Sequence, residues 1–149
     1  MQADQAIGAP QAHRNGWVQQ VFVGLAWLLA GTMLAQVFLA GMNVFTQPRW
    51  WGLHIQLGHA IGGGLMLLAL VAWLGRLPTR LRWCALLALG LFALQYNHRT
   101  IAGLFHLPAL AALHAANALV LFWLTTSLAR WGGRSGFFAD HSGLERSKT

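Results

Sequence analysis

The sequence predicts an all-α protein, a four-helix transmembrane bundle built from two similar helical hairpins. Of its 149 residues, 56% are hydrophobic and only 9% are charged, whereas about a quarter of the residues in a soluble domain are charged. Apolar runs of roughly the 20 residues that an α-helix needs to cross a bilayer recur along the chain. A glutamine and a histidine also recur at similar spacing in both halves of the chain.

The predicted transmembrane domain covers residues 17–130 and lies between two tails. Residues 1–16 are polar and show no hydrophobic period, so they predict a disordered N-terminal tail. Residues 131–149 are rich in glycine, serine and charge, and they predict a disordered C-terminal tail. The first helix is expected at residues 17–44. This run is longer than the ~7–15 apolar residues of a signal peptide and no Ala-x-Ala site follows it, so we interpret it as a retained anchor.

Three further helices are expected. Residues 50–74 are apolar and carry no formal charge, which predicts a span. A short polar turn at 75–80 leads to a helix at about 81–95. Residues 97–106 begin with polar side chains and are expected to connect this helix to the last one, which runs from about residue 107 or 108 to 129.

The basic residues predict the orientation. The net charge of +7 does not indicate a nucleic-acid-binding protein, because the basic residues lie at the ends of apolar runs. With four spans, eight basic residues fall on the side of the two termini and two on the other side. The positive-inside rule therefore places both termini in the cytoplasm. The eight are Arg14, Arg76, Arg80, Arg82, Arg130, Arg134, Arg146 and Lys148; the two are Arg49 and Arg99.

An internal repeat predicts a cofactor site. Gln36 precedes His54 by 18 residues, and Gln95 precedes His114 by 19. Two such hairpins packed together would place the histidines opposite each other across the bundle core, where cofactors are commonly held. We therefore expect His54 and His114 to be metal ligands. Since Cys84 is the lone cysteine, there is no Cys-x-x-Cys-His site for covalent haem attachment.

Small residues beside the histidines point to haem b. His54, Gly58 and Gly62 are spaced at i, i+4 and i+8, so they share one helix face and leave a flat strip for a planar macrocycle. On the other helix, Asn117 follows His114 at i+3. The alternative is simple helix packing, because Gly-x-x-x-Gly is common where transmembrane helices meet.

Other polar residues leave alternatives open. His59 points about 140° away from His54 on a straight helix, but its depth matches that of His114 better, so it is the second choice as ligand. Gln36 and Gln95 would either bond across helices or line the cofactor edge. Arg49 and Arg99 would pair with haem propionates or with lipid phosphates. His98 and His106, near a helix end, are expected to be solvated or capping.

Two motifs carry a resemblance to known proteins. Leu53-His54-x-x-x-Gly58 and Leu113-His114-x-x-Asn117, with Gln36 upstream, resemble a family of small uncharacterised bacterial four-helix membrane proteins. More distantly they are similar to one half of haem A synthase, whose four-helix units hold haem between histidines near the outer face. The synthase has a glutamate shortly before its first histidine, whereas residues 48–51 here contain no acid. The resemblance therefore implies haem binding rather than synthase chemistry and, since the similar small proteins are bacterial, a bacterial cytoplasmic (inner) membrane.

The favoured hypothesis is a b-type haem protein that transfers electrons through a bis-histidine haem near the outer face. A non-haem scaffold or accessory subunit of a larger membrane complex is the alternative, and a small-molecule or metal-ion carrier is a third. No residue set for hydrolytic chemistry is recognised, so an electron carrier or accessory subunit is expected rather than a stand-alone enzyme. The expected partners are the lipid bilayer and a quinone, a periplasmic redox protein, a larger complex or a second copy of the chain.

Overall fold

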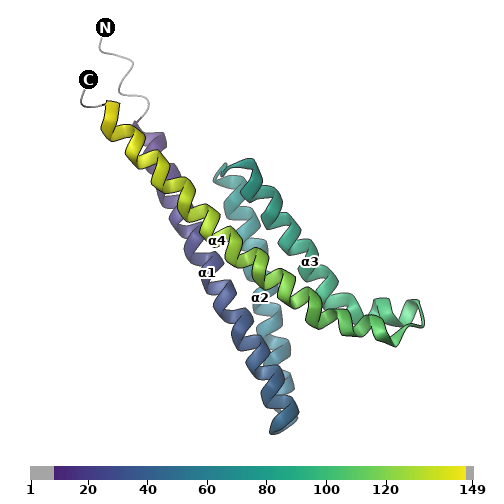
Figure 1. The fold of residues 1–149 in the computed structure, drawn as a ribbon. Coiled ribbons are helices and arrows are strands. Elements are labelled where there is room, and N and C mark those ends of the chain that lie inside the picture. Colours follow the sequence, from purple (N-terminus) through teal and green to yellow (C-terminus); the bar gives the residue numbers. More distant parts are fainter. Residues whose placement is uncertain (1–8, 147–149) are drawn as a thin grey trace.

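The structure is a computed structural model that describes residues 9–146, with side chains at 16–98, 100–107 and 109–134. This part of the chain is helical, apart from short turns between the helices. Four α-helices and one short 3-10 helix follow one another along the chain (Figure 1). They are α1 (Ala9–Phe45), α2 (Trp50–Leu74), α3 (Thr79–Leu104), η1 (Pro108–Ala112) and α4 (Leu113–Arg146).

Each helix packs against two others. α1 contacts α2 and α4, and α3 also contacts α2 and α4, so α2 and α4 lie diagonally opposite each other. In Figure 1 the start of α1 and the end of α4 run side by side at the upper left. The turn between α1 and α2 lies at the bottom of that view, and the turn that precedes α4 lies at the lower right. The two hairpins thus pack together at one end and point apart at the other.

Three helices are long and apolar enough to cross a membrane: Gly16–Phe45, Trp50–Leu74 and Ala109–Arg134. Their outward surfaces carry large apolar side chains, among them Leu28, Leu67 and Leu119. Side chains of this kind would be costly in water but are at no disadvantage among lipid tails. The prediction of apolar spans is therefore confirmed for these three helices.

α3 is not among the three. Arg80 and Arg82 lie at its start, and polar residues follow Leu94, so the uninterrupted apolar stretch covers only residues 83–94. At 1.5 Å per residue this stretch is about 18 Å long, compared with about 30 Å for the hydrocarbon core of a bilayer. The predicted fourth span is therefore not supported by length and composition.

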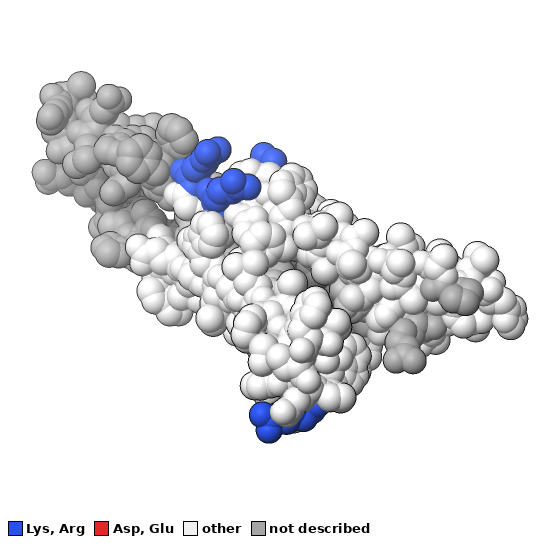
Figure 2. Space-filling model, turned by 60° about the horizontal axis from the view of Figure 1, so that its bottom comes forward, with Lys and Arg blue, Asp and Glu red and all other residues white. Residues whose placement is uncertain are grey.

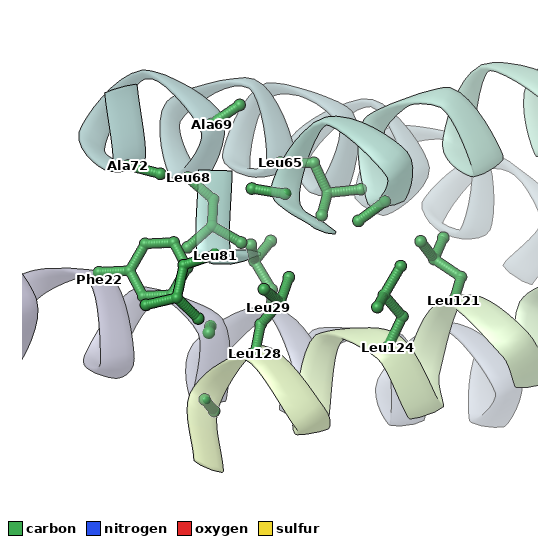
Figure 3. Close-up of a cluster of buried hydrophobic side chains, with 14 of the residues drawn as sticks. Phe22, Leu29, Leu65, Leu68, Ala69, Ala72, Leu81, Leu121, Leu124 and Leu128 are labelled. Carbon is green, nitrogen blue, oxygen red and sulfur yellow. The ribbon is translucent and has the colours of Figure 1, made fainter. Parts of the chain in front are cut away.

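The apolar core lies where the four helices come together (Figure 3). Phe22 and Leu29 of α1 meet Leu65 and Leu68 of α2, and Leu128 of α4 closes the cluster. All five are buried. This core fixes the spacing of the helices and so holds the polar residues near the other end of the bundle in place.

α2 and α3 end in the same backbone motif. Arg76 and His106 adopt positive φ values of 51° and 52°. In each case the next residue donates its N–H to the carbonyl five residues earlier: Leu77 to Ala72, and Leu107 to Ala102, both at 3.0 Å. This is a Schellman C-cap, in which a left-handed residue turns the chain and satisfies carbonyls at the helix end. The predicted capping role of His106 is therefore served by its backbone.

The helix ends differ from those expected. α2 has its predicted bounds, but α1 begins at Ala9 and α4 continues to Arg146, so much of each predicted tail is helical. Residues 1–8 and 147–149 lie outside the described residues. Pro10 in the first turn of α1 does not interrupt it, because that N–H would be unpaired in any case. On α4, the Gln19 side chain of α1 donates to the Gly132 carbonyl and holds the helix against α1 beyond residue 129.

The predicted connection at 97–106 was also wrong for most of its length, because α3 continues to Leu104. The polar residues there are compatible with a helix. Asn97 donates its side-chain N–H to the carbonyl of Ala93, four residues earlier, at 2.8 Å. The side-chain bond therefore follows the helical pattern instead of competing with it.

Candidate functional site

His54 lies in the second turn of α2 and is only 9% exposed. Its Nδ1 atom is 3.1 Å from the backbone oxygen of Gln36 on α1. Because a carbonyl oxygen only accepts hydrogen bonds, Nδ1 carries the proton, and Nε2 of the neutral ring keeps its lone pair. The Trp51 indole stacks on the ring, with centroids 4.8 Å apart and an interplanar angle of 9°. A buried imidazole whose tautomer and orientation are fixed in this way is suited to ligate a metal through Nε2.

Gln36 binds His54 a second time. Its side-chain Nε2 donates to the backbone oxygen of His54 at 2.7 Å. The same amide's Oε1 atom is buried and has no hydrogen-bond partner among the described residues. The Gln36 amide thus links α1 to α2 through a hydrogen bond, as expected for a polar residue between transmembrane helices. Its Oε1 atom could still accept a hydrogen bond.

His114 is the second residue of α4, directly after η1. Its ring centroid lies 6.5 Å from that of His54, and the two planes make an angle of 42°. Since α2 and α4 are diagonal to each other, the two rings approach across the bundle. The structure therefore brings together the two histidines that the internal repeat singled out.

His98 on α3 is the third member of the group, and sequence reasoning did not assign it to the site. Its Nδ1 atom lies 3.2 Å from Nδ1 of His114 and 2.9 Å from the backbone oxygen of Gln95. The Gln95 carbonyl also interacts with the His114 ring. Two N–H groups cannot point at each other at this distance, and the Gln95 carbonyl only accepts hydrogen bonds, so Nδ1 of His98 carries a proton. The Nε2 atom of His114 is free, as in His54, when the Nδ1–H of His114 also points at the Gln95 carbonyl.

The glutamine–histidine pairing is therefore similar in the two halves. In each, the backbone oxygen of the glutamine interacts with the ring of the histidine that follows it, 18 or 19 residues later. In the second half Asn117 adds further bonds. Its Nδ2 atom donates to Oε1 of Gln95 at 2.7 Å and to the backbone oxygen of Leu91 at 2.8 Å. Gln95 and Asn117 thus join α3 to α4 beside His114.

The predicted glycine strip is covered by protein. A Cβ atom on Gly58 would lie 3.2 Å from Nε2 of Gln36, and one on Gly62 would lie 2.5 Å from the Phe92 ring. Both glycines therefore let side chains of neighbouring helices approach α2 closely. The geometry favours the helix-packing interpretation of this strip over an open surface for a macrocycle.

His59 does not join the histidine group. It is exposed on α2, and its Nε2 atom lies 3.0 Å from the hydroxyl oxygen of Tyr96 on α3. The contacts of the two rings therefore favour His54 over His59 as the partner of His114.

Arg49 is exposed at the start of α2, with its guanidinium 5.5 Å from the centre of the Trp50 ring. This is a cation–π distance and suits a position at a membrane interface. The side chain of Arg99 lies outside the described residues. No described contact brings Arg49 to either ligand candidate.

A small pocket of about 50 Å³ lies between α3, η1 and α4. Its volume exceeds what a water molecule needs but is far below the ~300–1,000 Å³ typical of sites for larger organic ligands. Across the described side chains, no group of three or more His, Cys, Asp or Glu residues could hold a metal ion by itself. The lining residues are Leu94, Gln95, His98, Ile101, Leu110, Leu113, His114 and Asn117.

One comparison with known proteins gave a match. A family model described as a family of unknown function (DUF6220) matches residues 36–100. This segment contains Gln36, His54 and Gln95 and stops before His114. It agrees with the expected resemblance to an uncharacterised family. No curated protein and no solved structure matches the chain, so neither comparison links it to haem A synthase.

Proposed function

We propose that the protein is an integral membrane protein that binds haem b non-covalently between His54 and His114 and serves as an electron carrier. The separation of the two rings is the observation that carries this proposal. A metal–imidazole bond of about 2.0–2.1 Å, with the ring centre about 1.1 Å behind the nitrogen, sets two opposed rings about 6.3 Å apart. The observed separation is 6.5 Å.

The hydrogen bonds on the other ring nitrogens support the same pair. Gln36 fixes His54 with its Nε2 lone pair free, and an N–H bond from Nδ1 of His114 to the Gln95 carbonyl would give His114 the same state. Such second-shell bonds orient ligating imidazoles and raise their basicity. When bound, haem iron with two axial histidines supplies one-electron transfer and leaves no open coordination position.

The proposal requires the side chains around the histidines to make room. The pocket beside His114 is smaller than a macrocycle, and Phe92 and Gln36 cover the two glycines of α2. The hairpins point apart at the turns that precede α2 and α4 (Figure 1), and both histidines lie close to these turns. The room must come from side chains such as Phe92 turning aside, because separation of the hairpins would lengthen the 6.5 Å between the two rings.

The same closed packing favours a second candidate, a non-haem accessory subunit of a larger membrane complex. In that case His54, His98 and His114 serve only as a polar link between the helices. The spectrum described below separates the two candidates, because a purely structural link needs no cofactor.

We also propose the predicted topology, with α3 as a short fourth span packed against α2 and α4, and both termini in the cytoplasm of a bacterium. Arg76, Arg80 and Arg82 then lie on the cytoplasmic side with the end of α4. This follows from the eight-to-two distribution of basic residues. The haem would lie near the outer face, within reach of a quinone, a periplasmic redox protein or another subunit.

The test is the absorption spectrum of the purified protein, first oxidised and then reduced with dithionite. The wild-type protein is expected to show a b-type spectrum, which His54→Ala or His114→Ala abolishes by removing one axial nitrogen. His59→Ala is the matched control on α2 and should keep the spectrum. Loss of the spectrum in His59→Ala but not in His54→Ala would refute the assignment. Absence of haem from the wild-type protein after expression with ample haem would favour the accessory subunit.

A further inference from the structure

The end of the bundle opposite the histidines carries a concentrated positive charge. We define the arginine–tryptophan cluster as the five arginines and three tryptophans at this end of the described part of the chain. On the face shown in Figure 2, Lys and Arg residues gather at opposite ends of an uncharged surface, with no acidic residue visible. The cluster consists of Arg76, Arg80, Arg82, Arg130, Arg134, Trp73, Trp83 and Trp131.

The cluster joins α3 to α4 through Arg80. Its guanidinium carbon lies 3.8 Å from the centre of the Trp131 ring. A guanidinium that stacks by its face keeps its N–H donors in its own plane, parallel to the ring, where they can bind two oxygens of a phosphate. None of the hydrogen bonds within the described residues uses Arg80, so these donors are available.

Arg82, about half a helical turn after Arg80, contacts α2 instead of α4. Its guanidinium carbon lies 5.3 Å from the Trp73 ring, and Nη2 donates to the Thr79 hydroxyl at 3.0 Å. The Nε atom is buried and has no hydrogen-bond partner among the described residues. A buried donor without an acceptor is costly. Because an anion from outside cannot reach this atom while it is buried, Arg82 contributes its positive charge to the cluster and not this N–H.

Among the described side chains, none is a carboxylate that could pair with the cluster. The only acidic residues of the sequence are Asp4, Asp140 and Glu145, and none lies among the described side chains. The described arginines therefore have no carboxylate partner in this part of the chain. Their mutual repulsion would be relieved by a bound anion.

The surface next to the cluster is apolar and exposed, which favours an anion that carries apolar chains. Trp83 is 60% exposed, and Leu74 and Leu87 beside it are also exposed. Trp83 packs edge-on against Trp73, with centroids 5.7 Å apart, as is common at the level of lipid head groups. A free phosphate would leave this apolar surface uncovered, whereas a phospholipid would cover it with its acyl chains.

We propose that the arginine–tryptophan cluster is a binding site for the phosphate of an anionic phospholipid. Arg80 binds the phosphate, the charge of Arg82 adds to the attraction, and the tryptophans set the depth of the head group. This inference is independent of haem binding. Anionic lipid attracts each nearby basic residue by enough to change affinity about fivefold.

The test measures how strongly the full-length protein in phosphatidylcholine nanodiscs prefers spin-labelled phosphatidylglycerol over spin-labelled phosphatidylcholine. The wild-type protein should prefer phosphatidylglycerol. Arg80→Gln and Arg82→Gln should each lower this preference about fivefold, and Thr46→Ala, an uncharged exposed residue at the other end of the bundle, should leave it unchanged. Arg80→Lys keeps the charge but loses the planar stack, so an intermediate preference is expected even where a glutamine variant folds poorly.

Two results would overturn the proposal. One is an equal preference in the wild-type protein and in well-folded Arg80→Gln and Arg82→Gln variants, with helicity checked by circular dichroism. The other is displacement of the labelled lipid by millimolar inorganic phosphate, which would show a site for a free anion. Persistence of the lipid preference in the presence of phosphate supports the lipid assignment.

Discussion

Replacing Gly62 by alanine tests whether the glycines of α2 serve to pack the helices. The new Cβ would lie 2.5 Å from Cε1 of Phe92, about 1 Å inside ordinary van der Waals contact. Relieving such an overlap in a packed interior typically costs about 1–3 kcal/mol. Alanine also favours the helix by about 1 kcal/mol relative to glycine, so the net destabilisation should be about 0–2 kcal/mol.

Gly63 is the matched control, since it is the next residue of the same helix and a Cβ there meets nothing within 4 Å. Gly63→Ala should therefore stabilise the protein by about 1 kcal/mol. Subtracting the unfolding free energies of the two variants cancels the helix propensity and leaves the cost of the overlap with Phe92, about 1–3 kcal/mol. Reversible unfolding in mixed micelles measures both free energies. The smaller side chain of Phe92→Leu should restore most of the stability lost in Gly62→Ala.

Equal stabilities of the Gly62→Ala and Gly63→Ala proteins would refute this reasoning. They would show that no side chain of α3 packs against Gly62 in the folded protein, and the strip would then be open for a ligand.

Three further outcomes are expected. Asn117→Ala removes the donor of two bonds to α3 and should lower the unfolding free energy by about 1–2 kcal/mol. Asn97→Ala, whose bond is exposed, should change it little. Equal losses in the two variants would contradict a structural role of the Asn117 bonds. His106→Gly places glycine at a position with positive φ and should raise the unfolding free energy by up to about 1 kcal/mol. Leu104→Gly, at the end of α3, should lower it by a similar amount. Destabilisation by His106→Gly would contradict the C-cap conformation of residue 106. A C-terminal fluorescent-protein fusion should be bright and a C-terminal alkaline phosphatase fusion inactive, and the opposite pattern would contradict cytoplasmic termini.

The apolar patterns were sufficient to predict α2 and the pairing within each hairpin. Residues 50–74 contain no charge, and an arginine with a proline soon after it follows the run, so both ends of the helix were recognisable. The glutamine–histidine repeat predicted that His54 and His114 would lie opposite each other across the core, and their rings are 6.5 Å apart. Gln36 was expected to bond across helices or to line a cofactor edge, and it bonds across to His54.

Other features depend on tertiary contacts that a pattern cannot show. The sequence pattern did not assign His98 to the site, because the polar residues after Gln95 predict the end of the helix. α3 continues past them because polar side chains such as Asn97 form hydrogen bonds within the helix. The glycine strip was predicted to be open, but Phe92 covers it, and the sequence does not reveal which helix faces Gly62. A signal for His98 was present, since it follows Gln95 by three residues, one helical turn.

The central proposal is that His54 and His114 both bind the iron of one haem. Electron paramagnetic resonance of the oxidised, purified protein, together with carbon monoxide binding to the reduced protein, tests this most directly. Two histidine ligands predict a low-spin ferric signal and little carbon monoxide binding, because no axial position is open. His114→Ala should convert the signal to high spin or lose the haem. A high-spin signal with rapid carbon monoxide binding in the wild-type protein would contradict the two-histidine site.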